Sequence, residues 1–173
     1  MSEDKQILPL RKRILLYALV ENLAYWFIGS FVWIPWYFSE PIGIVTMLVS
    51  VPVITALATI YCLKRTPTTM WKKEIWLLIA TFIITCAIID LLFWVTWRGN
   101  PILEWYLPIS RVGIGNFIGY LEMIISSVIA LVIALRFTRL QKSSFFNRLD
   151  ERSLAVLGAL FFALNLYFAI TYW

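Results

Sequence analysis

Five long apolar stretches dominate this sequence and limit what it can fold into. They lie at about residues 14–38, 43–63, 75–97, 112–135 and 154–173. A helix needs about 20 apolar residues to cross the hydrocarbon core of a bilayer, and each stretch is long enough. The sequence therefore predicts an all-α, polytopic membrane protein, a bundle of five transmembrane helices that forms a single domain over residues 1–173.

The composition agrees with this prediction. Hydrophobic residues make up 61% of the chain and charged residues 14%, whereas soluble domains have about 45–50% apolar and about 25% charged residues. The longest connection, residues 136–153, is too short to be a soluble domain. We therefore expect the protein to act within the bilayer, at its surfaces or through a partner.

The positions of the basic residues predict the orientation. With five spans, the N-terminus and the second and fourth loops lie on one side of the membrane, and this side carries all but two of the 15 Lys and Arg residues. The opposite side carries Arg98 and Arg111. Cytoplasmic loops are enriched in Lys and Arg, so the N-terminus is predicted to be cytoplasmic and the C-terminus external. Topology also explains the net charge of +5 better than a nucleic-acid partner, and none is expected.

Several kinds of chemistry are excluded by missing residues. The chain has no histidine, so it cannot offer imidazole ligands to a metal or form a Ser–His or Cys–His nucleophile pair. The two cysteines, Cys62 and Cys86, form no CxxC motif and are expected to be packing residues. We expect no metal site and no cofactor.

Three carboxylates lie within the predicted spans: Glu21, Asp90 and Glu122. Each carboxylate at a helix centre costs about 2.5–3.5 kcal/mol on the insertion scale. Asp90 and Glu122 each lie about 21–22 Å from the inner boundary at 1.5 Å per residue, so they occupy one level. Two neighbouring carboxylates in a low dielectric do not both ionise easily, which suggests a shared, exchangeable proton.

Other polar and small residues surround that level. In the fourth span Gly115, Gly119, Glu122 and Ser126 fall on one stripe, with Asn116 beside it. The Gly115-x-x-x-Gly119 spacing allows close approach of another helix and predicts that Glu122 points into the bundle. The candidate ligand-binding or ion-binding residues are Asp90, Glu122, Asn116, Ser126, Asn165, Glu21 and Tyr25.

A structural role for the acids is the alternative. Each acid could be protonated, or hydrogen-bonded to an asparagine, to Thr85 or to a tyrosine, and fix the register of the helices. Glu21 lies only about 10 Å above the inner boundary, where an interfacial ion pair is expected. Pro35 and Pro52 are expected to break or kink the first two helices, and the freed carbonyls could line a cavity.

A second group of candidate residues lies on the predicted external side. Arg98, Arg111, Glu104 and Trp97 could gate a cavity that leads toward Asp90. The alternative is a set of loop ion pairs worth about 0–1 kcal/mol each. The tryptophans near this side are expected to form an aromatic belt at the membrane interface, with a partly aromatic pocket as the second interpretation.

No known family is assigned from the residues. Five spans and abundant tryptophan are also features of the translocator-protein family, but this chain lacks that family's long first loop rich in tryptophan and proline. Lipoprotein signal peptidases use two membrane carboxylates, but their asparagine–alanine–aspartate context is missing around Asp90.

The leading functional hypothesis is a small multi-pass protein of the cytoplasmic membrane. It would bind or transport a small ligand, proton or cation through an intramembrane cavity lined by buried carboxylates. The alternative is a non-catalytic accessory subunit of a larger membrane complex, and a lipid-modifying enzyme comes third. Besides the lipid bilayer, the expected partners are other membrane subunits or further copies of this chain.

Overall fold

The computed structural model describes residues 8–136 and 151–172, and over these ranges the chain is helical with no strand. Five helices are long and apolar enough to cross a membrane: Leu10–Phe38, Glu40–Leu63, Thr68–Trp97, Arg111–Arg136 and Arg152–Thr171. Each overlaps a predicted span, so the prediction of an all-α, multi-pass membrane protein is confirmed. The orientation and the choice of membrane stay predictions.

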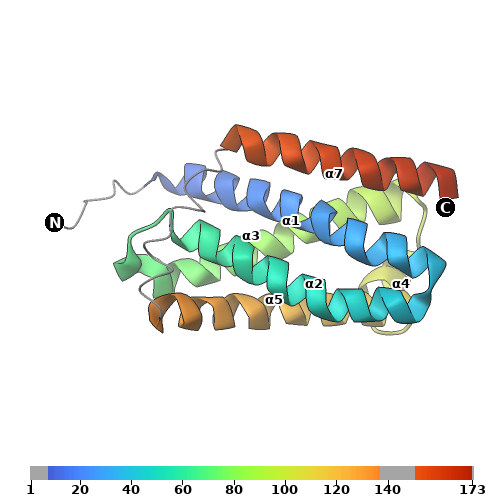
Figure 1. The fold of residues 1–173 in the computed structure, drawn as a ribbon, viewed down its shortest axis with the longest axis horizontal. Coiled ribbons are helices and arrows are strands. Elements are labelled where there is room, and N and C mark those ends of the chain that lie inside the picture. Colours follow the sequence, from blue (N-terminus) through green and yellow to red (C-terminus); the bar gives the residue numbers. More distant parts are fainter. Residues whose placement is uncertain (1–7, 137–150, 173) are drawn as a thin grey trace.

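The elements follow the chain in a simple order (Figure 1). Helices α1 (Leu10–Phe38) and α2 (Glu40–Leu63) are joined at Ser39. A short 3-10 turn, η1 (Thr68–Met70), leads into α3 (Trp71–Ile89), which continues as the π-helical segment η2 (Asp90–Trp97). The short α4 (Ile102–Tyr106) precedes α5 (Arg111–Arg136), and α7 (Glu151–Tyr172) ends the described chain.

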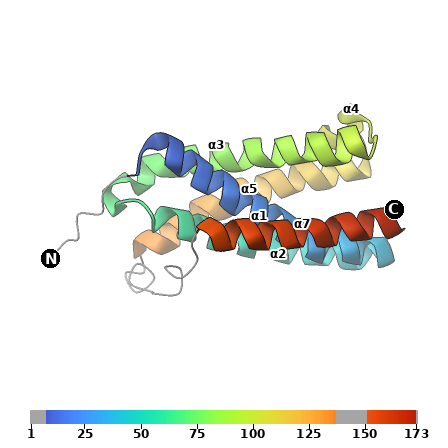
Figure 2. The same ribbon diagram turned by 90° about the horizontal axis from the view of Figure 1, so that it is seen from above.

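The bundle has two ends that differ in charge. The η1 end contains η1, the start of α1, the end of α5 and the start of α7, whereas the α4 end contains α4 and the turn between α1 and α2 (Figures 1 and 2). Most basic residues of the described chain lie at the η1 end: Arg11, Lys12, Arg13, Lys64, Arg65, Lys72, Lys73, Arg136 and Arg152. Arg98 and Arg111 lie at the α4 end. Lys5, Arg139, Lys142 and Arg148, also used for the orientation, fall outside the described residues.

The prolines do not interrupt the helices. Pro35 lies inside α1 and Pro52 inside α2, and both helices continue beyond them. The expected breaks are therefore absent from these two helices. Pro41, in contrast, lies in the first turn of α2. N–H groups in the first turn have no acceptor within the helix, so the missing N–H of proline costs no hydrogen bond there.

The surface of the bundle suits a lipid environment. Large apolar side chains lie exposed on every spanning helix, among them Phe31, Val49, Ile84, Ile129 and Leu160. The interior at the η1 end is a packed cluster from α2, α3 and α5 that includes Leu63, Trp71, Ile75 and Ala130. An apolar exterior around such a core is expected where lipid replaces water as the solvent.

Candidate functional site

Asp90 is held by two tyrosines in the interior of the bundle. It begins η2, and its side chain is only 4% exposed. The hydroxyl of Tyr25 on α1 donates to Asp90 Oδ1, and the hydroxyl of Tyr120 on α5 donates to Oδ2 over 2.7 Å. The indole N–H of Trp94 donates to the Tyr25 oxygen over 2.8 Å. Asp90 thus joins three elements through both of its oxygens.

Glu21 lies one helical turn before Tyr25 on α1 and is less well satisfied. Its side chain is 2% exposed, and the thiol of Cys86 lies 2.9 Å from Oε1 and donates to it. Its other oxygen, Oε2, is buried and has no hydrogen-bond partner in the described part of the chain. The expected interfacial ion pair of Glu21 is therefore not found, because this acid faces the interior and a thiol, not a cation.

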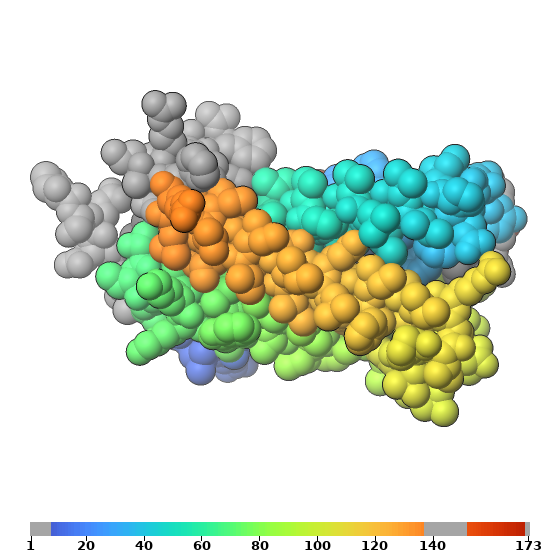
Figure 3. Space-filling view, turned by 90° about the horizontal axis from the view of Figure 1, so that it is seen from below, coloured from blue at the N-terminus to red at the C-terminus, as the bar shows by residue number. Residues whose placement is uncertain are grey.

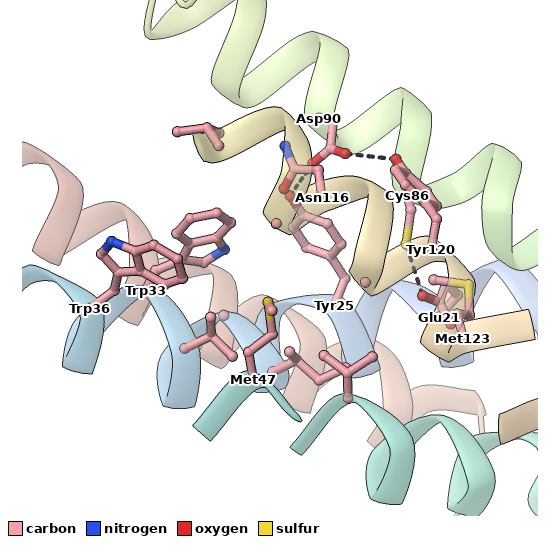
Figure 4. Close-up of a pocket in the computed structure, with 17 residues that line it drawn as sticks. Glu21, Tyr25, Trp33, Trp36, Met47, Cys86, Asp90, Asn116, Tyr120 and Met123 are labelled. Atoms are coloured by element: carbon pink, nitrogen blue, oxygen red, sulfur yellow. Dashed lines mark hydrogen bonds between the residues drawn. The ribbon is translucent and has the colours of Figure 1, made fainter. Parts of the chain in front are cut away.

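Both acids line one cavity of about 180 Å³. Its 17 lining residues come from α1, α2, α3, η2 and α5. Figure 4 shows Glu21 toward one end of the cavity, Trp33 and Trp36 toward the other, and Asp90 and Tyr25 together between them. The lining is mainly apolar and, among these residues, contains no lysine or arginine.

The π-helical segment helps to place Asp90. The widened turn over Asp90–Trp97 turns Asp90, Phe93 and Trp94 inward, and the hydroxyl of Thr96 donates to the carbonyl of Leu91, five residues earlier. Such π-helical turns are rare in proteins, and many of those that do occur lie at functional sites. A regular helix is the expectation from the sequence here, because the apolar pattern of the third span carries no sign of the wider turn.

Gly115 and Gly119 of α5 face the cavity and not a neighbouring helix. A Cβ atom at Gly115 or Gly119 would meet nothing within 4 Å among the described residues, so the described helices make no close approach at the predicted Gly115-x-x-x-Gly119 position. Further along α5, Ser127 is hydrogen-bonded to Thr59 of α2 over 3.1 Å. Helices α2 and α5 therefore meet at the η1 end and separate toward the α4 end (Figures 2 and 3).

Glu122 does not join Asp90. It is half-buried, it is not among the residues that line the cavity, and its Oε2 is buried without a hydrogen-bond partner in the described residues. The described hydrogen bonds of Asp90 are to tyrosines. Asp90 thus lines the same cavity as Glu21, where the sequence suggested a pair with Glu122.

The other interior candidates separate into two groups. Asn116 and Tyr25 line the cavity, and the Asn116 amide donates to the Trp105 carbonyl over 3.0 Å. Asn165 and Ser126 are buried outside it. The amide of Asn165 donates to the carbonyl of Trp26 over 2.9 Å, which attaches α7 to α1.

The four residues expected to form an external gate do not form one cluster. Arg111 pairs with Glu40 over 3.3 Å, and the Arg111 side chain is 85% exposed. Arg98 lies over the Trp97 ring and donates to a carbonyl of α7 over 3.4 Å, while Glu104 is exposed on α4. None of the four lines the cavity with the acids.

The tryptophans at the α4 end form an internal cluster and not only a belt. Trp94 and Trp105 are each 3% exposed and stack with ring centroids 5.4 Å apart. Trp33 lies 5.2 Å from Trp94 by the same measure and lines the cavity with Trp36. The belt interpretation is therefore wrong for Trp94 and Trp105, whereas Trp97 is 49% exposed and agrees with it.

Sequence reasoning missed two parts of the interior. Tyr120 follows Asn116 by four residues, so its place on the cavity side could have been read from the helical period. Glu74 of α3 accepts hydrogen bonds from Arg13 and from Tyr17, the latter over 2.8 Å. No sequence signal linked Arg13 to Glu74, because the two lie on different helices.

Comparison with known proteins finds no matching family, no similar curated protein and no similar solved structure. The described residues also contain no group of three or more metal-ligating side chains that could hold a metal ion. Function is therefore inferred from the cavity itself.

Proposed function

We propose that this protein binds a small ligand or cation inside the membrane, in the cavity lined by Glu21 and Asp90, and carries it across the bilayer. One observation supports this above all others: Glu21 Oε2 is buried at the cavity without a partner in the described residues. Carboxylates inside a membrane are costly and are typical of ligand, ion or proton sites.

The charge distribution supports a location in the cytoplasmic membrane with the N-terminus inside. The basic η1 end would face the cytoplasm, by the same rule that set the orientation from the sequence. The α4 end, with the tryptophan-lined part of the cavity, would then face outward. Five helices enclose little volume, so we propose that the chain works as a homo-oligomer or within a larger complex.

Filling the cavity tests the proposal. Gly119→Leu adds a side chain where a Cβ has open space, so it should fill the cavity while the protein still folds. Ala80→Leu on the exposed face of α3 is the matched control. Native mass spectrometry of protein purified in mild detergent should detect a bound small molecule with wild type and Ala80→Leu, and lose it with Gly119→Leu. Equal occupancy in all three would contradict the proposal.

Transport needs a separate measurement. Proteoliposomes that contain wild type should take up the molecule identified by mass spectrometry, and both Glu21→Gln and Asp90→Asn should abolish uptake. Binding that persists without any uptake would limit the function to binding.

An accessory role is the second candidate, and a groove on the outside of the bundle favours it. This groove of about 580 Å³ lies between α1, η2 and α7 and includes the small residues Ala155, Gly158 and Ala159. Small residues at membrane-helix surfaces allow a partner helix to approach closely. Ala155→Leu with Ala159→Leu should then remove a co-purifying subunit, while cavity variants should retain it.

A further inference from the structure

The cavity is long and narrow. Its lining on α1 runs along one face of the helix from Glu21 to Trp36, which corresponds to about 22 Å at 1.5 Å per residue. Its volume is about 180 Å³, not much larger than an engineered cavity of about 150 Å³ that holds one benzene molecule. A volume of this size spread over such a length fits a linear molecule better than a fused ring system.

The two ends of the cavity differ in chemistry. Glu21, Asp90, Tyr25 and Tyr120 give the inner end its polar groups. Beyond the Asn116 amide the lining toward the α4 end is apolar, with Ile28 and Val32 of α1, Met47 and Val51 of α2, and Val112 of α5, and it ends at Trp33 and Trp36. A ligand that fits both ends has one polar head and one apolar tail.

The charge of the lining selects the head group. Two acids and no lysine or arginine lie among the lining residues of the described chain. Asp90 already accepts a tyrosine hydroxyl on each oxygen, so Glu21 Oε2 is the buried acceptor that lacks a partner in the described residues. A buried carboxylate requires a donor or a positive charge nearby, and an anionic head would be repelled.

An inorganic divalent cation fits this lining poorly. Ca²⁺ takes six to eight oxygen ligands, and Mg²⁺ demands octahedral geometry and retains several waters. Beyond the acids and the two tyrosines, the cavity wall is mainly aliphatic, aromatic or glycine. An organic cation needs only one or two acceptors for its head and gains from the apolar wall through contact with its tail.

We infer that the ligand is a linear alkylammonium ion, with its head at Glu21 and its chain along α1 toward Trp33 and Trp36. This inference rests on the proposed function and narrows its ligand class. The ammonium group donates to Glu21 Oε2, and the chain lies between α1, α2 and α5. The open space beside Gly115 and Gly119 of α5 provides the room for the chain.

Photolabelling of the full chain in phosphatidylcholine nanodiscs tests the inference. The probe is n-octylammonium with a diazirine at the end of its chain, and the matched probes are the alcohol and the carboxylate with the same chain. After illumination, peptide mapping locates the label. The ammonium probe should label Ile28, Val32, Met47 or Val51, which line the part of the cavity that an eight-carbon chain reaches from Glu21, and unlabelled octylammonium should compete with it. The alcohol should label these residues at least about tenfold less at equal concentration, because its neutral hydroxyl can donate a hydrogen bond to Glu21 but lacks the positive charge that strengthens the bond from the ammonium.

Two variants distinguish loss of the contact between Glu21 and the ammonium head from a general loss of structure. Glu21→Gln should weaken ammonium labelling at least about tenfold, whereas Glu122→Gln, an acid outside the cavity, should leave it unchanged. Circular dichroism and resistance to SDS should match wild type in both variants. The comparison of head groups on wild type alone keeps the inference testable if Glu21→Gln does not fold.

The outcomes distinguish the inference from the proposed function. If the alcohol or the carboxylate labels the cavity as strongly as the ammonium, the alkylammonium inference is overturned, while the cavity stands as a ligand site. The inference is overturned in the same way if Glu21→Gln, folded as wild type, labels normally. If none of the three probes labels the cavity above the lipid-facing residues, both the inference and the proposed function fail.

Discussion

Glu74 and Glu21 are both buried glutamates of this bundle, and their surroundings are opposite. Glu74, near the η1 end, accepts hydrogen bonds from Arg13 and Tyr17. Glu21, further into the membrane, has the Cys86 thiol on one oxygen and, among the described residues, no partner on the other. The first acid is fixed by its neighbours, and the second retains an acceptor for a ligand. Residue type alone therefore does not separate a structural acid from a functional one.

The packing of α5 also differs between the two ends of the bundle. At the η1 end Ala130 and Ala134 of α5 are 0% and 1% exposed, so the helix lies directly against its neighbours. At the α4 end Gly115 and Gly119 of the same helix have open space where a Cβ would be. One helix thus closes the bundle at one end and leaves a cavity at the other.

Breaking the Arg13–Glu74 pair should give the largest loss of stability. Glu74→Ala leaves Arg13, whose side chain is 12% exposed, without its carboxylate, and breaking a buried pair costs about 3–5 kcal/mol. Unfolding in SDS, followed by circular dichroism, should show a loss of about 3 kcal/mol, since Arg13 can partly reach the interface. Replacing both partners with methionine should restore much of the loss. A loss below about 1 kcal/mol, the range of surface pairs, would contradict the structural role of Glu74.

The fold could be predicted because a helix that crosses a membrane must be apolar over a known length. Apolar stretches of sufficient length define the spans, and the described helix bounds overlap the predicted ones. What the sequence missed has a local physical cause. Pro35 and Pro52 were expected to break or kink their helices, and the helices continue through them without a break. The π-helical turn at Asp90 leaves no mark in an apolar pattern.

The site was predictable only in part, because depth is easier to infer than direction. Counting residues placed Asp90 deep in the bundle, and the structure has it buried there. Counting residues did not show that Asp90 would contact Tyr25 and Tyr120. Those contacts depend on which face each of α1, η2 and α5 turns toward the others. For the same reason Glu122 shares a depth with Asp90 but lines no common cavity.

A larger side chain on α5 should have different effects on stability at the two ends of the bundle. Ala130→Leu adds volume at a fully buried position and should destabilise the protein by about 2 kcal/mol through overpacking. Gly119→Leu adds a larger side chain where no described atom lies within 4 Å of the Cβ. It should leave stability unchanged or raise it by up to about 1 kcal/mol, because glycine is a poor helix former. SDS unfolding of the two variants side by side measures the difference, and equal losses would show that α5 packs alike along its length.

Removing the Tyr120 hydroxyl, which donates to Asp90, should cause a smaller loss of stability. Tyr120→Phe leaves Asp90 Oδ2 without its 2.7 Å hydrogen bond, and an unsatisfied buried acceptor costs about 1–3 kcal/mol. We expect a loss of about 1.5 kcal/mol in SDS unfolding. Tyr167→Phe, on the exposed face of α7, is the matched control and should leave stability unchanged. An equal loss in both variants would mean that the Tyr120 hydroxyl contributes nothing specific to Asp90.

Glu21→Gln should give the smallest change in stability and the largest change in binding. The variant retains the shape of the side chain and an oxygen for the Cys86 thiol, and the oxygen that it replaces has no partner in the described residues. Since no described hydrogen bond or ion pair is lost, stability should stay within about 0.5 kcal/mol of wild type. A loss as large as that of Glu74→Ala would mean that Glu21, too, is fixed by the protein. A stable variant that no longer binds would show that Glu21 serves the ligand and not the fold.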